Sequence, residues 1–468
     1  MKSELLGAIG WNIATKIVAA GFAFLSIPIF TRLLSTSDYG NYALYMSWLG
    51  ILFPIISAGL HLSIARAKIE YANYYSSYVS SIVALVVLFF LIQVLLVFFF
   101  IEDIKALLSL NSSLIFILTL HSFFQAVILI SLEYFRYKGR YKATAFFEIL
   151  QPVLIIMVSV LMVIFSLTDS AYLNRVVGTV LPMALLSFIL IFIIMKEGKV
   201  YYSSEYWKYG VCFSLPLIPG AIAFVMNAQL DKILISKFLG SHETGIYSFS
   251  YTIGMLVLLV GNAIKQAINP WIFKSLEEGE INNASYANLN FSKFVMLISL
   301  VSLYISPELV YYIAPHEYHS GLDVLHWIIL GGFFQQLMSI EVTNVMFLKR
   351  SKWYSIVAVI GTLLNFGMNL YFIPIYGIKG AAITTFVSCL VMFSVMLLIN
   401  RKVLRISTFN VKWYAFVIST TLLFFLIYIL VKDNLILRVF MVLSLFLSFI
   451  FMYRVEIKSI INSKSLRV

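Results

Sequence analysis

DKILISKFLGSHETGIY, the stretch from Asp231 to Tyr247, begins inside one apolar segment, crosses a short polar turn and ends inside the next apolar segment. The same pattern occurs once before, because a shift of 205 positions places the segment that begins at Thr31 on the one that begins at Ser236. The residue pairs that agree are Asp38 with Glu243, Gly40 with Gly245, and Tyr42 with Tyr247. A repeat at this spacing predicts two halves of similar build and not a solenoid of short repeats.

The composition is that of an integral membrane protein. Hydrophobic residues make up 61% of the 468 residues, charged residues make up 12%, and the mean hydropathy is +0.96. A soluble chain has about 25% charged residues, and one spanning helix needs roughly 20 apolar residues. In a soluble protein the net charge of +12 would suggest nucleic acid as a partner. Here we expect no nucleic-acid partner, because most basic residues lie in the loops of one membrane face.

The apolar segments predict an all-α membrane protein of about fourteen spanning helices, because backbone inside lipid must satisfy its own hydrogen bonds. The predicted spans are residues 9–31, 41–64, 77–100, 113–135, 144–167, 171–195, 209–236, 245–269, 288–306, 322–346, 354–375, 380–400, 411–431 and 435–453. With these spans, 22 Lys and Arg residues lie on the side of the N-terminus, seven lie on the opposite side, and four lie within spans. Since short loops rich in Lys and Arg stay in the cytoplasm, both termini are predicted to be cytoplasmic.

A second repeat supports the first. FRYKGRY at Phe135–Tyr141 precedes the fifth span, and FLKRSKW at Phe347–Trp353 precedes the eleventh, 212 positions later. Two sets of six spans therefore match in order, and an even number of spans per repeat makes two parallel six-helix bundles related by a pseudo-two-fold axis along the membrane normal. The predicted domains are an N-terminal six-helix bundle at 1–200, a C-terminal six-helix bundle at 201–405, and two additional helices with a cytoplasmic tail at 406–468.

The sequence contains no pattern typical of an enzyme. None of the predicted connecting loops is long enough to fold as a catalytic domain, and neither a GxxxxGK[ST] phosphate loop nor a GxSxG nucleophile motif occurs. His316 and His319 lack a third ligand at the spacing of a metal site. We therefore expect a protein that is not an enzyme, uses no cofactor and holds no metal.

Charged residues inside the spans mark candidate sites, because a charge at the centre of a spanning helix costs about 2.5–3.5 kcal/mol and usually faces a cavity or a partner. Lys16 lies in the first span, and Asn12 lies one helical turn earlier on the same face. His61 and Arg66 lie near the inner end of the second span, and the 205-residue shift places His61 beside the position of Lys265. These five residues predict a substrate-binding cavity of cationic character, which would suit an anionic group.

The remaining intramembrane candidates, for a gate or for coupling, are Asn227, Asp231, Lys232 and Glu341. The adjacent pair of charges at 231 and 232 falls in the outer half of the membrane, which favours a gate or a contact between bundles. The stem of Lys232 could instead extend toward the membrane surface. Glu133 and Glu148 border the basic loop from Arg136 to Lys142, so we expect them to form ion pairs at the membrane surface.

Several segments resemble one known family. They are Asp231–Gly240 with Gly245–Tyr247, Thr31–Leu34 with Tyr39–Tyr42, Asn269–Trp271, and NFGMNLYFIPIYGIKGAA at Asn365–Ala382. Together they are similar to the polysaccharide (Wzx-type) flippases of the multidrug/oligosaccharidyl-lipid/polysaccharide (MOP) exporter superfamily, over nearly the whole chain. The last of these segments is the most specific.

The resemblance implies a flippase in the bacterial inner membrane, which would translocate oligosaccharide repeat units linked to undecaprenyl pyrophosphate for O-antigen, capsule or exopolysaccharide biosynthesis. It implies two six-helix bundles in a V around a cationic cavity that opens to alternate membrane faces. Implied partners are the lipid-linked oligosaccharide, membrane lipids, and a polysaccharide polymerase with chain-length proteins. The family's cationic roles transfer to Lys16 and Arg66, whereas His61 and Lys265 rest on the repeat alone.

Two alternatives stay open. A cation-coupled multidrug exporter of the same superfamily would use buried carboxylates, for which Asp231 and Glu341 are candidates. A membrane polysaccharide polymerase or ligase would be expected to carry a large catalytic outer loop, which is absent from this sequence. The residues do not indicate which sugar is carried or which ion drives transport.

Overall fold

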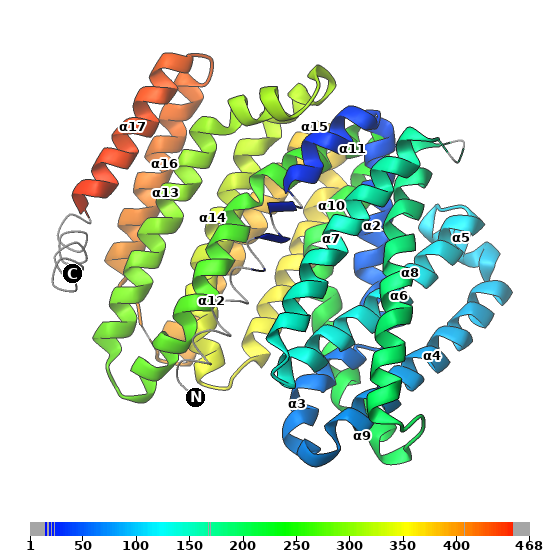
Figure 1. Cartoon of the computed structure of the whole chain (residues 1–468). Helices are drawn as coiled ribbons and strands as arrows, with labels where there is room; N and C mark the ends of the chain where they lie inside the picture. The colour runs from blue at the N-terminus through cyan, green and yellow to red at the C-terminus, as the bar shows by residue number, and fades with distance from the viewer. Residues whose placement is uncertain are drawn as a thin grey trace, which may run out of the picture. The chain divides into compact units, whose positions relative to one another are not determined.

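The computed structural model describes residues 15, 18, 19, 21, 22, 24–166, 168, 170–406 and 408–452, and for residues 224 and 449–452 it describes the backbone alone. Every regular element in these ranges is helical (Figure 1), which confirms the predicted all-α class. The chain divides into two compact units, Met1–Ser248 and Phe249–Val468. Their boundary lies within one helix and reflects packing, whereas the domains predicted at 1–200, 201–405 and 406–468 rest on the sequence repeat and stay a prediction.

The first unit begins, within the described residues, with a short apolar helix at Phe24–Leu33. The helices that follow are α2 Thr36–Ile56, η1 Leu60–Leu62, α3 Ser63–Glu70, η2 Ala72–Tyr74, α4 Tyr75–Phe99, α5 Ile101–Leu108, α6 Ser112–Tyr137, α7 Tyr141–Ile164, α8 Ala171–Gly198, α9 Ser204–Ser214, η3 Leu215–Leu217, α10 Ile218–Leu239 and α11 Ser241–Gly254. The second unit contains α12 Leu256–Glu277, α13 Ile281–Ile313, η4 His316–Gly321, α14 Leu322–Phe347, α15 Lys352–Leu398, the π-helix η5 Ile399–Val403, α16 Val411–Val431 and α17 Leu435–Met452.

The repeated sequence pattern corresponds to a helix start in both copies. Ser35 caps α2, because its hydroxyl accepts the Asp38 amide at 3.0 Å and donates to the Asp38 carboxylate at 2.7 Å. Asp38 lies in the first turn of α2, and Glu243 lies in the first turn of α11. An acidic side chain there is favoured by the positive end of the helix dipole. The turn at Gly240, with φ 89°, ends α10 just as the sequence predicts.

The number of membrane spans stays a prediction. Within the described residues, eight helices are long and apolar enough to cross a membrane, or up to ten if each of two bent helix pairs forms one span. One of the eight, Lys352–Val403, is 52 residues long and covers two predicted spans. It is interrupted at Gly377, where φ is 63° and ψ is −148°. The chain is a multi-pass membrane protein.

Two spans are broken helices. The second predicted span bends by 65° between α2 and η1, where Pro54 lies in the last turns of α2 and Gly59 has φ 58°. The seventh predicted span bends by 45° between Ser204–Ala223 and Val225–Leu239. Breaks of this kind leave backbone groups free to line a cavity.

Each unit has a core of its own. In the first unit, the window of α6 that could span a membrane is 67% buried and that of α7 is 11% buried, so α6 is central and α7 is peripheral. Tyr78, Val127 and Leu190 of α4, α6 and α8 are fully buried together. In the second unit α14 and α15 pack closely, and α16 and α17 pack on α13 (Figure 1).

Candidate functional site

Two of the predicted cavity residues, Asn12 and Lys16, lie outside the described residues. The other three lie in different environments. His61 lines a cavity of the first unit, Arg66 has an exposed side chain, and Lys265 is buried in the second unit. Each is described below within its own unit.

The first unit encloses a cavity of about 460 Å³ beside the bend of α2. Three polar side chains line it: His61 of η1, Gln125 of α6 and Gln229 of α10. The rest of the wall is apolar, with Phe53, Val225 and several neighbours. Such a mixture of apolar wall and a few convergent polar groups is typical of a ligand site.

His61 reaches this cavity because η1 follows directly on the bend. Its ring packs against Phe53, with 5.5 Å between ring centroids. Its Nδ1 is buried and has no hydrogen-bond partner within the described residues, as is true of Asn227 Oδ1 in α10. A buried polar atom without a partner costs free energy, so the Nδ1 of His61 favours a ligand that fills the cavity.

Arg66 does not face this cavity. Its guanidinium pairs with Glu70 one turn later in α3 at 2.7 Å, and 53% of its side chain is exposed. An exposed pair at this spacing contributes little to stability. Its role as a substrate cation therefore stays a prediction without support from the geometry of the unit.

The charged pair in α10 is held inside the first unit. Asp231 is 1% exposed and accepts a hydrogen bond from the Tyr247 hydroxyl of α11 at 2.8 Å. Lys232 donates to Gln229 Oε1 at 3.1 Å, and the same oxygen accepts the Ser47 hydroxyl at 3.0 Å. Asp231 thus fastens the two helices of the repeated stretch, while Lys232 is linked through Gln229 to the cavity wall.

Lys265 and Glu341 are the buried charges of the second unit. Lys265 of α12 is 5% exposed, its ammonium donates to Asn288 Oδ1 at 3.2 Å, and it lies 4.8 Å from the centroid of the Phe291 ring. Glu341 of α14 is 2% exposed and accepts hydrogen bonds from the Tyr414 hydroxyl and from Asn400 Nδ2, both at 2.6 Å. Charge-assisted hydrogen bonds of this kind stabilise a buried carboxylate.

The predicted ion pairs at the basic loop are confirmed. Arg136 of α6 pairs with Glu133, and it also pairs with Glu148 of α7 at 2.7 Å. Both carboxylates are therefore paired with the same guanidinium, Glu133 near the end of α6 and Glu148 two turns into α7. His121 is a packing residue, because it is 1% exposed and hydrogen-bonds the Tyr45 hydroxyl at 3.0 Å.

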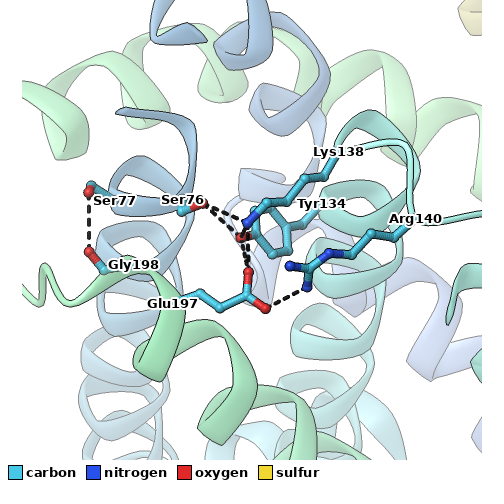
Figure 2. Close-up of polar contacts among 7 residues, drawn as sticks. All are labelled: Ser76, Ser77, Tyr134, Lys138, Arg140, Glu197 and Gly198. Carbon is cyan, nitrogen blue, oxygen red and sulfur yellow. Dashed lines mark hydrogen bonds and ion pairs between the residues drawn. The ribbon is translucent and has the colours of Figure 1, made fainter. Parts of the chain in front are cut away.

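A second cluster at this loop joins three helices (Figure 2). Lys138 donates to Glu197 and to Tyr134, both at 2.6 Å, and to Ser76 at 3.0 Å, while Arg140 donates to the other oxygen of Glu197 at 2.5 Å. Burial by itself lowers the pKa of Lys138, but the hydrogen bonds with Glu197 and Tyr134 outweigh it and raise that pKa above its ordinary value. The cluster fastens the ends of α4, α6 and α8, and its cations are already paired.

Sequence reasoning missed the neutral members of these sites. Gln125 is the single amide of the apolar helix α6, and Gln229 lies between Asn227 and Asp231 in α10. Both are polar residues within spans, a signal that could have been read in the same way as a charge. Asn288, Asn400 and Tyr414 carry no charge and lie far apart in the sequence.

Residues 5–276, more than half of the chain, match the sequence profile of a family described as polysaccharide biosynthesis protein. A protein of the Lsg locus of Haemophilus influenzae is 22% identical over 346 residues, which cover 71% of this chain and 77% of that protein. An uncharacterized membrane protein of Methanocaldococcus jannaschii is 20% identical over 186 residues, or 39% of this chain, and the match spans less than half of that protein, 43%.

Solved structures of transporters share the fold. The lipid II flippase MurJ in an inward closed conformation matches with a TM-score of 0.72 and 17% identity, over 96% of this chain and 100% of that one. An outward-facing multidrug resistance MATE family transporter of the MOP superfamily matches with a TM-score of 0.59 and 14% identity, over 84% and 94% of the two chains. The match to the polysaccharide biosynthesis family and the fold shared with these transporters bear out the predicted resemblance.

Proposed function

Because the chain belongs to the polysaccharide biosynthesis protein family, we propose that it is a flippase for oligosaccharide repeat units linked to undecaprenyl pyrophosphate. It acts in the bacterial inner membrane with both termini in the cytoplasm, and it serves O-antigen, capsule or exopolysaccharide biosynthesis. A polysaccharide polymerase and chain-length proteins are the proposed protein partners. The protein moves its substrate without catalysing a covalent step.

One observation carries the proposal: the ammonium of Lys265 is buried, yet its hydrogen-bond partner is a neutral amide and not a carboxylate. An ammonium held in this way gains from a doubly charged pyrophosphate in a medium of low dielectric constant. The cavity of the first unit, with His61, Gln125 and Gln229, suits sugar hydroxyls. Lys16 and Asn12 belong to the same proposed cationic set, and Asn227, Asp231 and Lys232 to a proposed gate.

The direct test is transport by the purified protein in liposomes. Undecaprenyl pyrophosphate bearing a fluorescent oligosaccharide is incorporated, and its transfer is followed by quenching with a reagent that does not cross the membrane. We expect protein-dependent transfer, and about tenfold slower transfer by Lys265→Met if one charge-assisted hydrogen bond to the pyrophosphate is lost. Transfer at the rate of protein-free liposomes by the native protein would overturn the proposal.

A cation-coupled multidrug exporter is the second candidate, because Asp231 and Glu341 are buried carboxylates in helices of a MATE-like fold. The two functions separate in the cell. Loss of a flippase removes surface polysaccharide and leaves drug susceptibility unchanged. Loss of an exporter leaves surface polysaccharide unchanged and raises drug susceptibility. Elongation of glycan chains by the purified protein would instead favour a polymerase or ligase.

A further inference from the structure

A chain of hydrogen bonds joins the two buried charges of the second unit. Lys265 donates to Asn288 Oδ1 at 3.2 Å, and Asn288 Nδ2 donates to the Thr408 hydroxyl at 3.2 Å. Thr408 then donates to Asn344 Oδ1 at 2.7 Å, and Asn344 Nδ2 donates to Glu341 Oε2 at 3.5 Å. The last contact is the longest of the four and so the weakest.

Every bond in this chain runs in the same direction. Each amide accepts at its oxygen and donates from its nitrogen, and the hydroxyl accepts from one side and donates to the other. A cation at the start and a carboxylate at the end polarise all the intervening groups in the same sense, which strengthens each bond. The carboxylate end is anchored separately, because Glu341 also accepts from Tyr414 and Asn400.

We propose that Asn288, Thr408 and Asn344 are positioning residues that hold the Lys265 ammonium and couple it to the charge of Glu341. The proposal rests on the proposed function for the role of Lys265 toward a pyrophosphate. In this arrangement the charge of Lys265 is linked to Glu341 through neutral groups and not by a direct ion pair. Within the described residues, Asn288 takes one of the three ammonium protons, so the others are available to an anionic ligand.

The relay makes the C-terminal segment part of the site. Thr408 lies in the loop before α16, and Tyr414 lies in the first turn of α16. The loop is fixed by Arg401, whose Nη2 donates to the Phe409 carbonyl oxygen at 2.6 Å. The sequence repeat ends before this segment, so symmetry between the halves gives no indication of its role.

Thr408→Val is the informative variant, since it removes the hydroxyl and keeps the shape. The matched control is Thr421→Val, because Thr421 is 1% exposed in α16 and its hydroxyl donates to the Val417 carbonyl of its own helix. In the liposome assay we expect Thr408→Val to transfer substrate about tenfold more slowly. The transfer rate of Thr421→Val is expected to stay within about twofold of the native rate. Thr408→Ser, which keeps the hydroxyl, is expected to transfer substrate at close to the native rate.

The second measurement distinguishes a positioning role of Thr408 from a general destabilisation of the protein. In a Lys265→Met background, Thr408→Val should cause no further loss of transport, because the group that it positions is gone. An equal loss in both backgrounds, or failure of Thr408→Ser to restore the rate, would overturn the proposal.

Thermal unfolding of the purified protein keeps this outcome separate from the proposed function. Lys265→Met and Glu341→Gln should shift the Tm non-additively when combined, since the relay links them. Additive shifts would overturn the relay, whatever the protein transports. Non-additive shifts with full transport by Lys265→Met would retain the relay and reject the pyrophosphate role of Lys265.

Discussion

Gly40 and Gly245, which occupy the same position in the two copies of the repeat, pack directly against each other. A Cβ atom on Gly40 would overlap the backbone oxygen of Ser241 and lie 2.8 Å from the Gly245 nitrogen, and one on Gly245 would overlap the backbone oxygen of Thr36. The contact is therefore similar in both directions, because each glycine lies against the backbone of the other helix. Small residues allow such close backbone approach in membranes.

We expect Gly40→Ala to destabilise the protein by about 1–3 kcal/mol, because backbone atoms cannot move aside as a side chain can. The measurement is thermal unfolding in detergent. Gly367→Ala is the matched control, since Gly367 lies within α15 and a Cβ there meets nothing within 4 Å. Alanine should be neutral or slightly favourable at that position. Equal Tm values for Gly40→Ala and the native protein would contradict the close contact.

Much of this local structure could be predicted from sequence, and the reasons are specific. Asp38 and Glu243 mark first turns of helices, and Gly40 and Gly245 match because one contact constrains both. Hydropathy does not indicate the bend between Ile56 and Leu60, because it does not report backbone direction, and the sequence signals for this bend are Pro54 and Gly59.

The buried relay also escaped prediction. Asn288, Asn344 and Thr408 are neutral residues, separated from one another by more than fifty positions. Neutral polar residues have no periodic pattern that would connect them, and only tertiary packing brings them between Lys265 and Glu341. The charges themselves could be identified, because each is costly in a spanning helix.

The break at Gly377 makes a prediction about topology. A continuous helix of the length of α15, 47 residues, would extend about 70 Å, whereas the membrane core is about 30 Å thick. We therefore expect α15 to cross the membrane twice. A reporter domain that is active only outside the cytoplasm should be active when inserted at Gly377 and inactive at Lys349 and Arg405. Activity at all three positions would contradict two crossings.

The cluster around Glu197 should stabilise the first unit at any pH near neutrality. Hydrogen bonds to charged groups contribute about 1.5–3 kcal/mol, but the Lys138 and Arg140 side chains are 29% and 42% exposed. Allowing for screening by solvent, we expect Glu197→Gln to cost about 1 kcal/mol. Glu102→Gln, which removes an exposed pair with Lys105 at 2.9 Å, is the control and should leave the Tm unchanged.

The pH dependence of that effect follows from the Lys138 pKa, which is raised in the folded state. A raised pKa means that the contribution is fully present below the unfolded value of about 10.4 and is lost as the pH rises through the folded value. The Tm difference between the native protein and Glu197→Gln should therefore be constant from about pH 6 to pH 9. A difference that disappears within this range would show that another group controls the cluster.

His61 gives the sharpest test of the cavity in the first unit. No carboxylate lines that cavity, and His61 packs on Phe53 with its Nδ1 unpaired among the described residues. We therefore expect His61 to act as a hydrogen-bonding group and not as a cation. His61→Gln, which keeps hydrogen-bonding capacity, should transfer substrate at close to the native rate, whereas His61→Leu should be about tenfold slower. His326→Leu is the control, because His326 packs on Phe425 and hydrogen-bonds the Leu322 carbonyl oxygen of its own helix. It should have little effect on the transfer rate. If His61→Gln and His61→Leu were equally slow, hydrogen-bonding capacity at this position would not be sufficient, and the expectation that His61 acts as a hydrogen-bonding group would be contradicted.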